Sequence, residues 1–145
     1  MMFAFSYPAT FRKDSAGRTL VLFPDFPRSA TDGATPVEAM EQAIDCLGSS
    51  ISFAMGDKVE IPRPSAPKRG QRMVSVPLWI APKLALYWRV RELGMSNSEL
   101  ARKLGVRETI VRRMLNPDHA TKAEKIQAAL ELLGKRFLMV LEDAA

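Results

Sequence analysis

A segment of twenty residues, Asn97–Asn116, constrains the fold of this chain more than any other part of the sequence. Its apolar residues recur at helical spacing on both sides of Gly105, and glycine tolerates the positive φ of a tight turn. Ala101 is small enough to lie where two helices cross steeply. The pattern therefore predicts two short helices joined by a turn, with a buried face made of Leu100, Leu104, Val106, Ile110, Val111, Met114 and Leu115.

The opposite face of the second predicted helix, with the basic residues near it, carries side chains suited to DNA. Arg and Asn form paired hydrogen bonds with the major-groove edges of guanine and adenine, and Arg and Lys also bind phosphates. A basic, solvated helix in an all-α domain is the alternative interpretation. We predict that DNA is contacted by Arg102, Lys103, Arg107, Glu108, Thr109, Arg112, Arg113 and Asn116.

The distribution of charge favours the DNA interpretation. The chain has 145 residues and a formal net charge of +5, of which residues 1–80 contribute +1 and residues 81–145 contribute +4. A local excess of positive charge is expected of a protein that binds a DNA duplex. The length allows two small domains, and we predict them at 1–80 and 81–145.

The first predicted domain has the α+β class, a small antiparallel sheet with one covering helix. The strands are expected from Phe3 through Phe11, over Thr19–Phe23 and over 72–80, with a short additional strand at 28–32. Asp14–Gly17 has the composition of a hairpin turn. Pro8 implies an edge or bulged position, and Pro24 and Pro27 are expected to separate the strands on either side of them.

A long helix is predicted from Thr35, with Glu38 completing a capping box, to about Gly56. Its apolar stripe is predicted to consist of Val37, Met40, Ala43, Ile44, Leu47 and Ile51. Three prolines between Glu60 and Gln71 indicate an exposed loop.

The second predicted domain is all-α. A helix is expected from Pro82 to Gly94, and another after a capping box of Thr121 and Glu124, with Ile126, Ala129, Leu130 and Leu133 as its buried stripe. The apolar run at 135–142 is either a strand that pairs with its copy in a second chain, which we favour, or a last helical turn. The first alternative predicts a homodimer or a higher homo-oligomer.

The sequence contains no recognisable catalytic or metal-binding pattern. His119 and Cys46 are each the only residue of their type, so a surface histidine and a buried thiol are expected. Asp14, Asp25 and Asp32 fall in predicted turns, where they do not converge as a magnesium site requires. We therefore predict no enzyme activity, no cofactor and no metal. No segment has the length of a membrane span and no leader is recognised, so a cytoplasmic protein is expected.

Two resemblances to known families cover most of the chain. Residues 20–47, with Tyr7-Pro8-Ala9 before them, resemble the N-terminal domain of HicB-type antitoxins through Phe23-Pro24-Asp25, Pro27, Thr31, Gly33, Thr35, Glu38-Ala39, Ala43 and Leu47. The segment at 97–116 resembles the helix-turn-helix of the lambda-repressor-like (Xre) family. The chain departs from these families at Arg28-Ser29, often Gly-Cys, and at Arg107, often Ser or Thr. Arg cannot accept a capping hydrogen bond, so Thr109 is expected to cap instead.

The resemblance implies a partial ribonuclease-H-like domain followed by a DNA-binding domain. It also implies that the chain neutralises a HicA-type toxin, a small basic messenger ribonuclease, and represses its own operon by binding operator DNA. A ligand-sensing regulator without a toxin partner is the alternative, and a small basic protein with one essential histidine, encoded by a neighbouring gene, would favour the antitoxin. Toxin contacts are predicted at five acidic residues, which as an alternative are turn-forming or solvent-facing charges: Asp25, Asp32, Glu38, Glu41 and Asp45.

Overall fold

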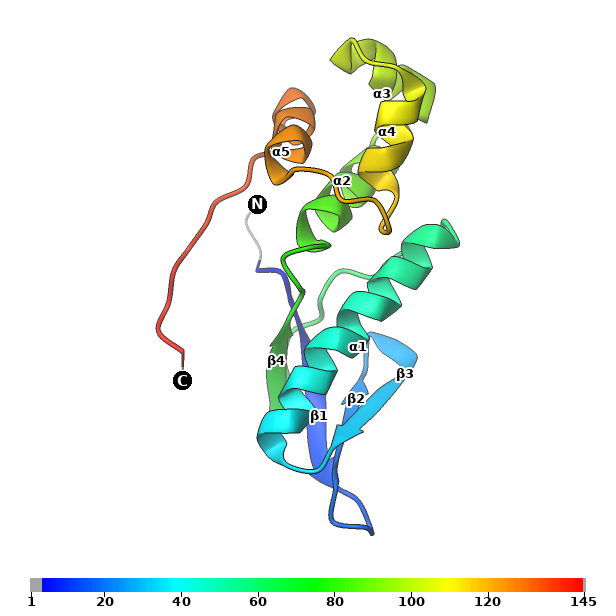
Figure 1. Cartoon of the computed structure of the whole chain (residues 1–145). Coiled ribbons are helices and arrows are strands. Elements are labelled where there is room, and N and C mark those ends of the chain that lie inside the picture. Colours follow the sequence, from blue (N-terminus) through cyan, green and yellow to red (C-terminus); the bar gives the residue numbers. More distant parts are fainter. Residues whose placement is uncertain (1–3, 145) are drawn as a thin grey trace. The chain divides into compact units, whose positions relative to one another are not determined.

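The computed structural model describes residues 4–144, and the chain divides into two compact units. The first unit ends at Ala81 and the second begins at Pro82. The first contains a four-stranded antiparallel sheet and one long helix, and only helices follow among the regular elements of residues 82–144 (Figure 1). The predicted α+β class is confirmed.

The strands of the first unit lie in the order β3-β2-β1-β4. β1 and β2 form the predicted hairpin, in which the Asp14 carboxylate accepts the N–H groups of Ala16 and Arg18. Gly17 has a φ of 79°, which the turn requires and glycine adopts without strain. The strand start predicted at Phe3 lies outside the described residues. The bounds are Ser6–Lys13 for β1, Thr19–Phe23 for β2, Phe26–Gly33 for β3 and Gln71–Ser75 for β4.

Two prolines lie in strands in places that the sequence did not predict. β1 is a central strand, so the edge position expected from Pro8 is wrong for the strand as a whole. Pro8 nevertheless lies where β1 pairs with β4 alone, because its pairing with β2 begins at Thr10. Pro27, predicted to lie in a break between strands, belongs to the edge strand β3, beside an irregularity in its ladder with β2. One-sided or irregular pairing tolerates a residue that has no N–H group.

The long helix α1, Pro36–Gly56, begins and ends where the sequence predicts. Thr35 Oγ1 accepts the N–H of Glu38 at 3.1 Å, and the Glu38 carboxylate accepts the N–H of Ala34 at 2.8 Å. The predicted apolar stripe is partly wrong, since Val37 is 72% exposed. The buried stripe is Ala39, Ala43, Leu47, Gly48, Ile51 and Met55.

The stripe differs because small residues let α1 approach the sheet closely. α1 lies across one face of the sheet, and β3 leads into it (Figure 1). A Cβ built on Gly33, at the end of β3, would come within 2.3 Å of the backbone nitrogen of Ala39. The helix therefore presents Ala39 and Ala43, rather than the larger Val37, to the sheet. The sheet contributes buried Tyr7, Ala9, Val21, Phe23 and Val74 to this core.

The strand predicted at 72–80 is wrong in its second half. β4 ends at Ser75, because Pro77 follows and cannot donate to a ladder. The chain beyond β4 still buries Val76 and Ile80, whereas Leu78 and Trp79 are exposed.

The proline-rich loop before β4 is mostly exposed, as predicted, but it makes contacts with β1 and with the turn between β2 and β3. Ile61 is buried, and the hydroxyl of Tyr7 donates to the carbonyl of Pro62 at 2.6 Å. Further along the loop, the backbone N–H of Ser65 donates to the Asp25 carboxylate at 3.0 Å. These contacts hold the loop against β1 and the β2–β3 turn.

The second unit consists of helices packed around a core of their own. Its buried residues come from all four helices and from the residue after the last one: Leu86, Val90, Leu100, Ala101, Val111, Met114, Ile126, Ala129, Leu130 and Leu133. The predicted stripe of the last helix is confirmed, as is the burial of Ala101. The helices are α2 (Ala81–Glu92), α3 (Asn97–Leu104), α4 (Glu108–Leu115) and α5 (Ala123–Leu132).

Two of the predicted helix caps are wrong, whereas the predicted end of α3 is confirmed. Gly105 ends α3 in the left-handed conformation, with a φ of 68°, as expected. Thr109 does not cap α4; Arg107 is its N-cap residue and makes no side-chain capping hydrogen bond within the described chain. Thr121 does not cap α5 either, because the helix begins one residue later, after Lys122. The hydroxyl of Thr121 lies 3.3 Å from the carbonyl of Arg113 and donates to it.

The apolar run at 135–142 forms neither a strand nor a helical turn in this single chain. Phe137 is partly buried against the core of the second unit, whereas Leu138, Met139, Val140 and Leu141 are exposed. The predicted pairing with a second chain is not tested by one copy and stays a prediction.

Candidate nucleic-acid interface

The residues predicted to contact DNA are all exposed, and they come from α3, α4 and the turns beside them. They are Arg102, Lys103, Arg107, Glu108, Thr109, Arg112, Arg113 and Asn116. Val111 and Met114 bury the opposite side of α4. One predicted core residue is wrong, since Val106 in the turn between α3 and α4 is 39% exposed. The α3–turn–α4 segment thus presents a polar and basic surface while its apolar side is fixed by packing.

The electrostatics of this surface are dominated by its arginines. The Arg112 guanidinium lies 3.5 Å from the Glu108 carboxylate one turn earlier, with both side chains largely exposed. An exposed ion pair of this kind contributes little stability and is readily exchanged for another partner. In the described part of the chain Arg113 forms no ion pair, so its charge is available to an external anion.

The side chain of Asn116 already makes a hydrogen bond within the chain, which the sequence did not indicate. Its side-chain oxygen accepts the N–H of Asp118 at 2.9 Å, which closes the turn after α4. A two-bond contact with adenine needs the amide oxygen as well as the amide N–H group. Asn116 would therefore have to share or break its turn hydrogen bond to bind a base.

A residue that sequence reasoning missed, Lys83, holds the end of α4 from inside the unit. Its side chain is 2% exposed, and its Nζ donates to the carbonyls of Arg113, at 3.0 Å, and Asn116. These carbonyls lie in the last turn of the helix and at its cap, so neither has an i+4 helical donor. Each accepts a nearby backbone N–H instead, that of Asn116 for Arg113 and that of His119 for Asn116. Burial lowers the pKa of Lys83, while its hydrogen bonds use the donors of the amine. The signal in the sequence was a lysine among the apolar residues at the start of α2, followed by Leu84 and Leu86.

The acidic residues predicted to bind the toxin are not equally available in the structure. Asp25 accepts from Ser65 at 3.0 Å, and Glu38 caps the start of α1. Asp32 receives the Arg18 guanidinium at 2.8 Å, and this hydrogen bond and charge lower the pKa of Asp32. Glu41 and Asp45 are exposed on α1. Of the five predicted residues, the last two are those most open to a partner.

The remaining polar candidates do not gather into a reactive site. The described residues contain no group of His, Cys, Asp and Glu side chains that could hold a metal ion. Cys46 is half-buried on α1, and burial raises the pKa of its thiol. His119 is exposed, with Nδ1 3.0 Å from the Thr121 hydroxyl. No helix in the described range is long and apolar enough to cross a membrane.

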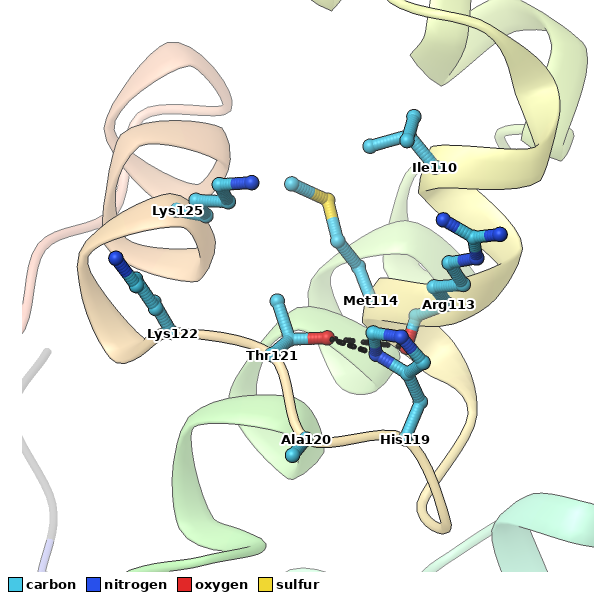
Figure 2. A pocket seen from close by; sticks show the side chains of 8 residues that line it. All are labelled: Ile110, Arg113, Met114, His119, Ala120, Thr121, Lys122 and Lys125. Carbon is cyan, nitrogen blue, oxygen red and sulfur yellow. Dashed lines mark hydrogen bonds between the residues drawn. The ribbon is translucent and has the colours of Figure 1, made fainter.

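His119 is one of the residues that line a cavity of about 200 Å³ beside the interface. The cavity lies between the last turn of α4 and the first turn of α5 (Figure 2). Arg113 therefore belongs both to the candidate interface and to this cavity, whose other lining residues include Lys122 and Lys125.

The structure is thus an α+β unit followed by a helical unit with a basic α3–turn–α4 surface. Comparison with known proteins gives the family. Residues 6–85 match the family model described as HicB_like antitoxin of bacterial toxin-antitoxin system. The chain belongs to this HicB-like antitoxin family.

The relatives extend the likeness to almost the whole chain. Antitoxin HicB 2 of Photorhabdus laumondii is 40% identical over 92% of this chain and 94% of its own length. Antitoxin HicB of Escherichia coli strain K12 is 35% identical over 93% and 98%, and Antitoxin HicB of Pseudomonas fluorescens is 33% identical over 83% of each chain. The likeness to these relatives therefore includes the second unit, which the family model barely enters.

Proposed function

We propose that this chain neutralises a HicA-type messenger ribonuclease toxin with its first unit and represses its own operon with its second. The family and the names of its relatives support the antitoxin role. The observation that carries the DNA role is the exposure of every predicted contact residue around α4. The proposed activity is binding alone, without a catalytic step, and it takes place in the cytoplasm, where bacterial DNA and messenger RNA lie.

In the proposed complex, α4 lies in the major groove of the operator. Its eight residues span about 12 Å, a length that the groove accommodates. Arg112 and Thr109 face base edges from the exposed side of the helix, while Arg102, Lys103 and Arg107 are close enough in sequence to reach phosphates. Phosphate contacts supply affinity, and base contacts supply the choice of sequence.

The active form is proposed to be a dimer or a higher oligomer. Two recognition helices on a two-fold axis read half-sites about 34–36 Å apart, one turn of the duplex. The exposed apolar run from Leu138 to Leu141 supports a contact between chains, since a lone chain leaves Leu141 100% exposed. Pairing of this segment with its copy would remove that surface from water.

The toxin contact is proposed to use the outer side of α1. A HicA-type toxin is basic, so acidic residues on the antitoxin would steer and orient it. Glu41 and Asp45 are exposed and lie one helical turn apart. Asp25, Asp32 and Glu38 already stabilise the first unit through their internal hydrogen bonds, so we rank them below these two.

Co-expression with the product of the neighbouring gene tests this proposal. A small basic protein should co-purify with the chain and should lose its ribonuclease activity in the complex. The complex should bind the DNA upstream of the two genes. A metabolic neighbour that does not co-purify would instead favour a ligand-sensing regulator.

A further inference from the structure

The cavity beside α4 is lined by groups that suit an anion. Three of its lining side chains, Arg113, Lys122 and Lys125, carry a positive charge at neutral pH, and His119 adds a ring that can donate hydrogen bonds. No carboxylate occurs among the described residues that line it. The lining cations come from α4, which carries Arg113, and from the start of α5, which carries Lys122 and Lys125 (Figure 2).

Hydrogen bonds fix one wall of the cavity, at His119 and Thr121. The Thr121 hydroxyl lies 3.0 Å from Nδ1 of His119 and 3.3 Å from the backbone carbonyl of Arg113 (Figure 2). Nζ of buried Lys83 lies 3.4 Å from the same hydroxyl. The side chains of Ile110 and Met114 also line the cavity. An anion would therefore meet one prearranged wall, with the charged side chains beside it.

The start of α5 adds a further favourable charge. Lys122 is the N-cap residue of α5, and no side-chain cap is present there in the described chain. Uncapped N–H groups give the start of a helix a partial positive charge, which favours a bound phosphate. Lys122 and Lys125 bring two full positive charges to the same end, against one negative charge from Glu124 in the first turn.

The position of the cavity relates it to the proposed DNA contact. Arg112 lies on the exposed side of α4, and Arg113, one residue on, turns toward the cavity. A phosphate backbone runs along each side of the major groove in which a recognition helix lies. A backbone of a duplex held on the exposed side of α4 would therefore pass close to Arg113, which lines the cavity.

We propose that this cavity binds a phosphate of the DNA backbone beside the groove, with Lys122 and Lys125 as its ligands together with Arg113. The inference rests on the proposed DNA-binding function and adds two residues outside the predicted contact set. Phosphate binding at this point would fix how far along the groove α4 lies. It would also add affinity that does not depend on sequence.

The test compares two double variants of the full chain that lose the same charge. Lys122→Gln/Lys125→Gln removes the cavity lysines, and Lys68→Gln/Arg69→Gln removes two exposed basic residues from a loop of the first unit. Binding to a random-sequence 30-base-pair duplex and to the DNA upstream of the gene is measured across a series of salt concentrations. Circular dichroism checks that both variants remain folded.

The cavity variant is expected to bind both DNAs about tenfold more weakly, with the slope of log affinity against log salt reduced by about 1, since each phosphate contact contributes about 0.9. The loop variant should match the wild type. Equal losses in both variants, or none in the cavity variant, would overturn the phosphate site while leaving the DNA function intact. A wild-type chain that binds neither DNA would overturn both proposals.

Discussion

The two units use their charged residues differently. In the first unit, acidic residues that the sequence offers to a partner are engaged within the chain: Asp25 holds a loop, Asp32 pairs with Arg18, and Glu38 caps a helix. In the second unit, the basic residues around α4 remain exposed. The charges that serve the second unit's own fold include buried Lys83 and Arg89, whose guanidinium donates to the carbonyl of Leu133. Exposure, rather than charge alone, therefore distinguishes residues open to a partner from residues that stabilise the fold.

The largest effect should follow from Leu47→Ala, which breaks the first unit alone. Leu47 is fully buried between α1 and the sheet, so its truncation should lower the free energy of unfolding of this unit by about 2–5 kcal/mol. Toxin binding should fall with it, while DNA binding survives because the second unit has its own core. Urea unfolding and toxin binding measure the change, and exposed Val37→Ala is the control. Unaltered stability would contradict the described core.

Lys83→Met should disturb the second unit by an intermediate amount. The change removes the charge-assisted hydrogen bonds of Lys83 to the carbonyls of Arg113 and Asn116, which keep their backbone donors, and should cost about 1.5–3 kcal/mol. DNA affinity should drop more than toxin affinity, since the end of α4 loses its support. Thermal unfolding and both binding assays provide the measurement, with exposed Lys135→Met as the control. Equal losses of the two affinities would mean that Lys83 acts on the whole chain.

Asp32→Asn should have the smallest effect. Its partner Arg18 is as exposed as Asp32, and exposed ion pairs contribute little. Because Arg18 lowers the pKa of Asp32, any stabilisation is present above the ordinary pKa of an aspartate and disappears as the pH falls through the lowered value. Wild type and variant should therefore differ slightly in urea midpoint at pH 7 and converge in acid. A growing difference at low pH would contradict the assignment.

Local signals in the sequence were sufficient for many elements. The hairpin turn, the strand Thr19–Phe23, the Thr35 cap and the glycine between α3 and α4 all depend on residues a few positions apart. The exposed side of α4 was predictable for the same reason, because the spacing of its apolar residues determines which side is buried and therefore which side is exposed. For these elements, side-chain chemistry and periodicity determine the local structure without contacts from distant parts of the chain.

Contacts between distant residues account for most of the predictions that were wrong. The buried stripe of α1 contains Ala39 instead of Val37 because the end of β3 approaches the helix closely at Gly33. Lys83 contacts carbonyls 30 and 33 residues later, and nothing near it in sequence announces them. The caps of α4 and α5 were misplaced because Arg107 and Lys122 begin those helices without a capping side chain. Sequence patterns describe one element at a time and do not reveal these pairings.

We propose that DNA binding belongs to the exposed side of α4 and is separate from toxin binding. The affinity of Arg112→Ala is measured for the DNA upstream of its gene and for the purified toxin from the neighbouring gene. We expect operator binding to weaken by about 1–3 kcal/mol if Arg112 contacts a base, while toxin affinity is unchanged. Operator binding as tight as that of the wild type, or an equal loss toward the toxin, would contradict it.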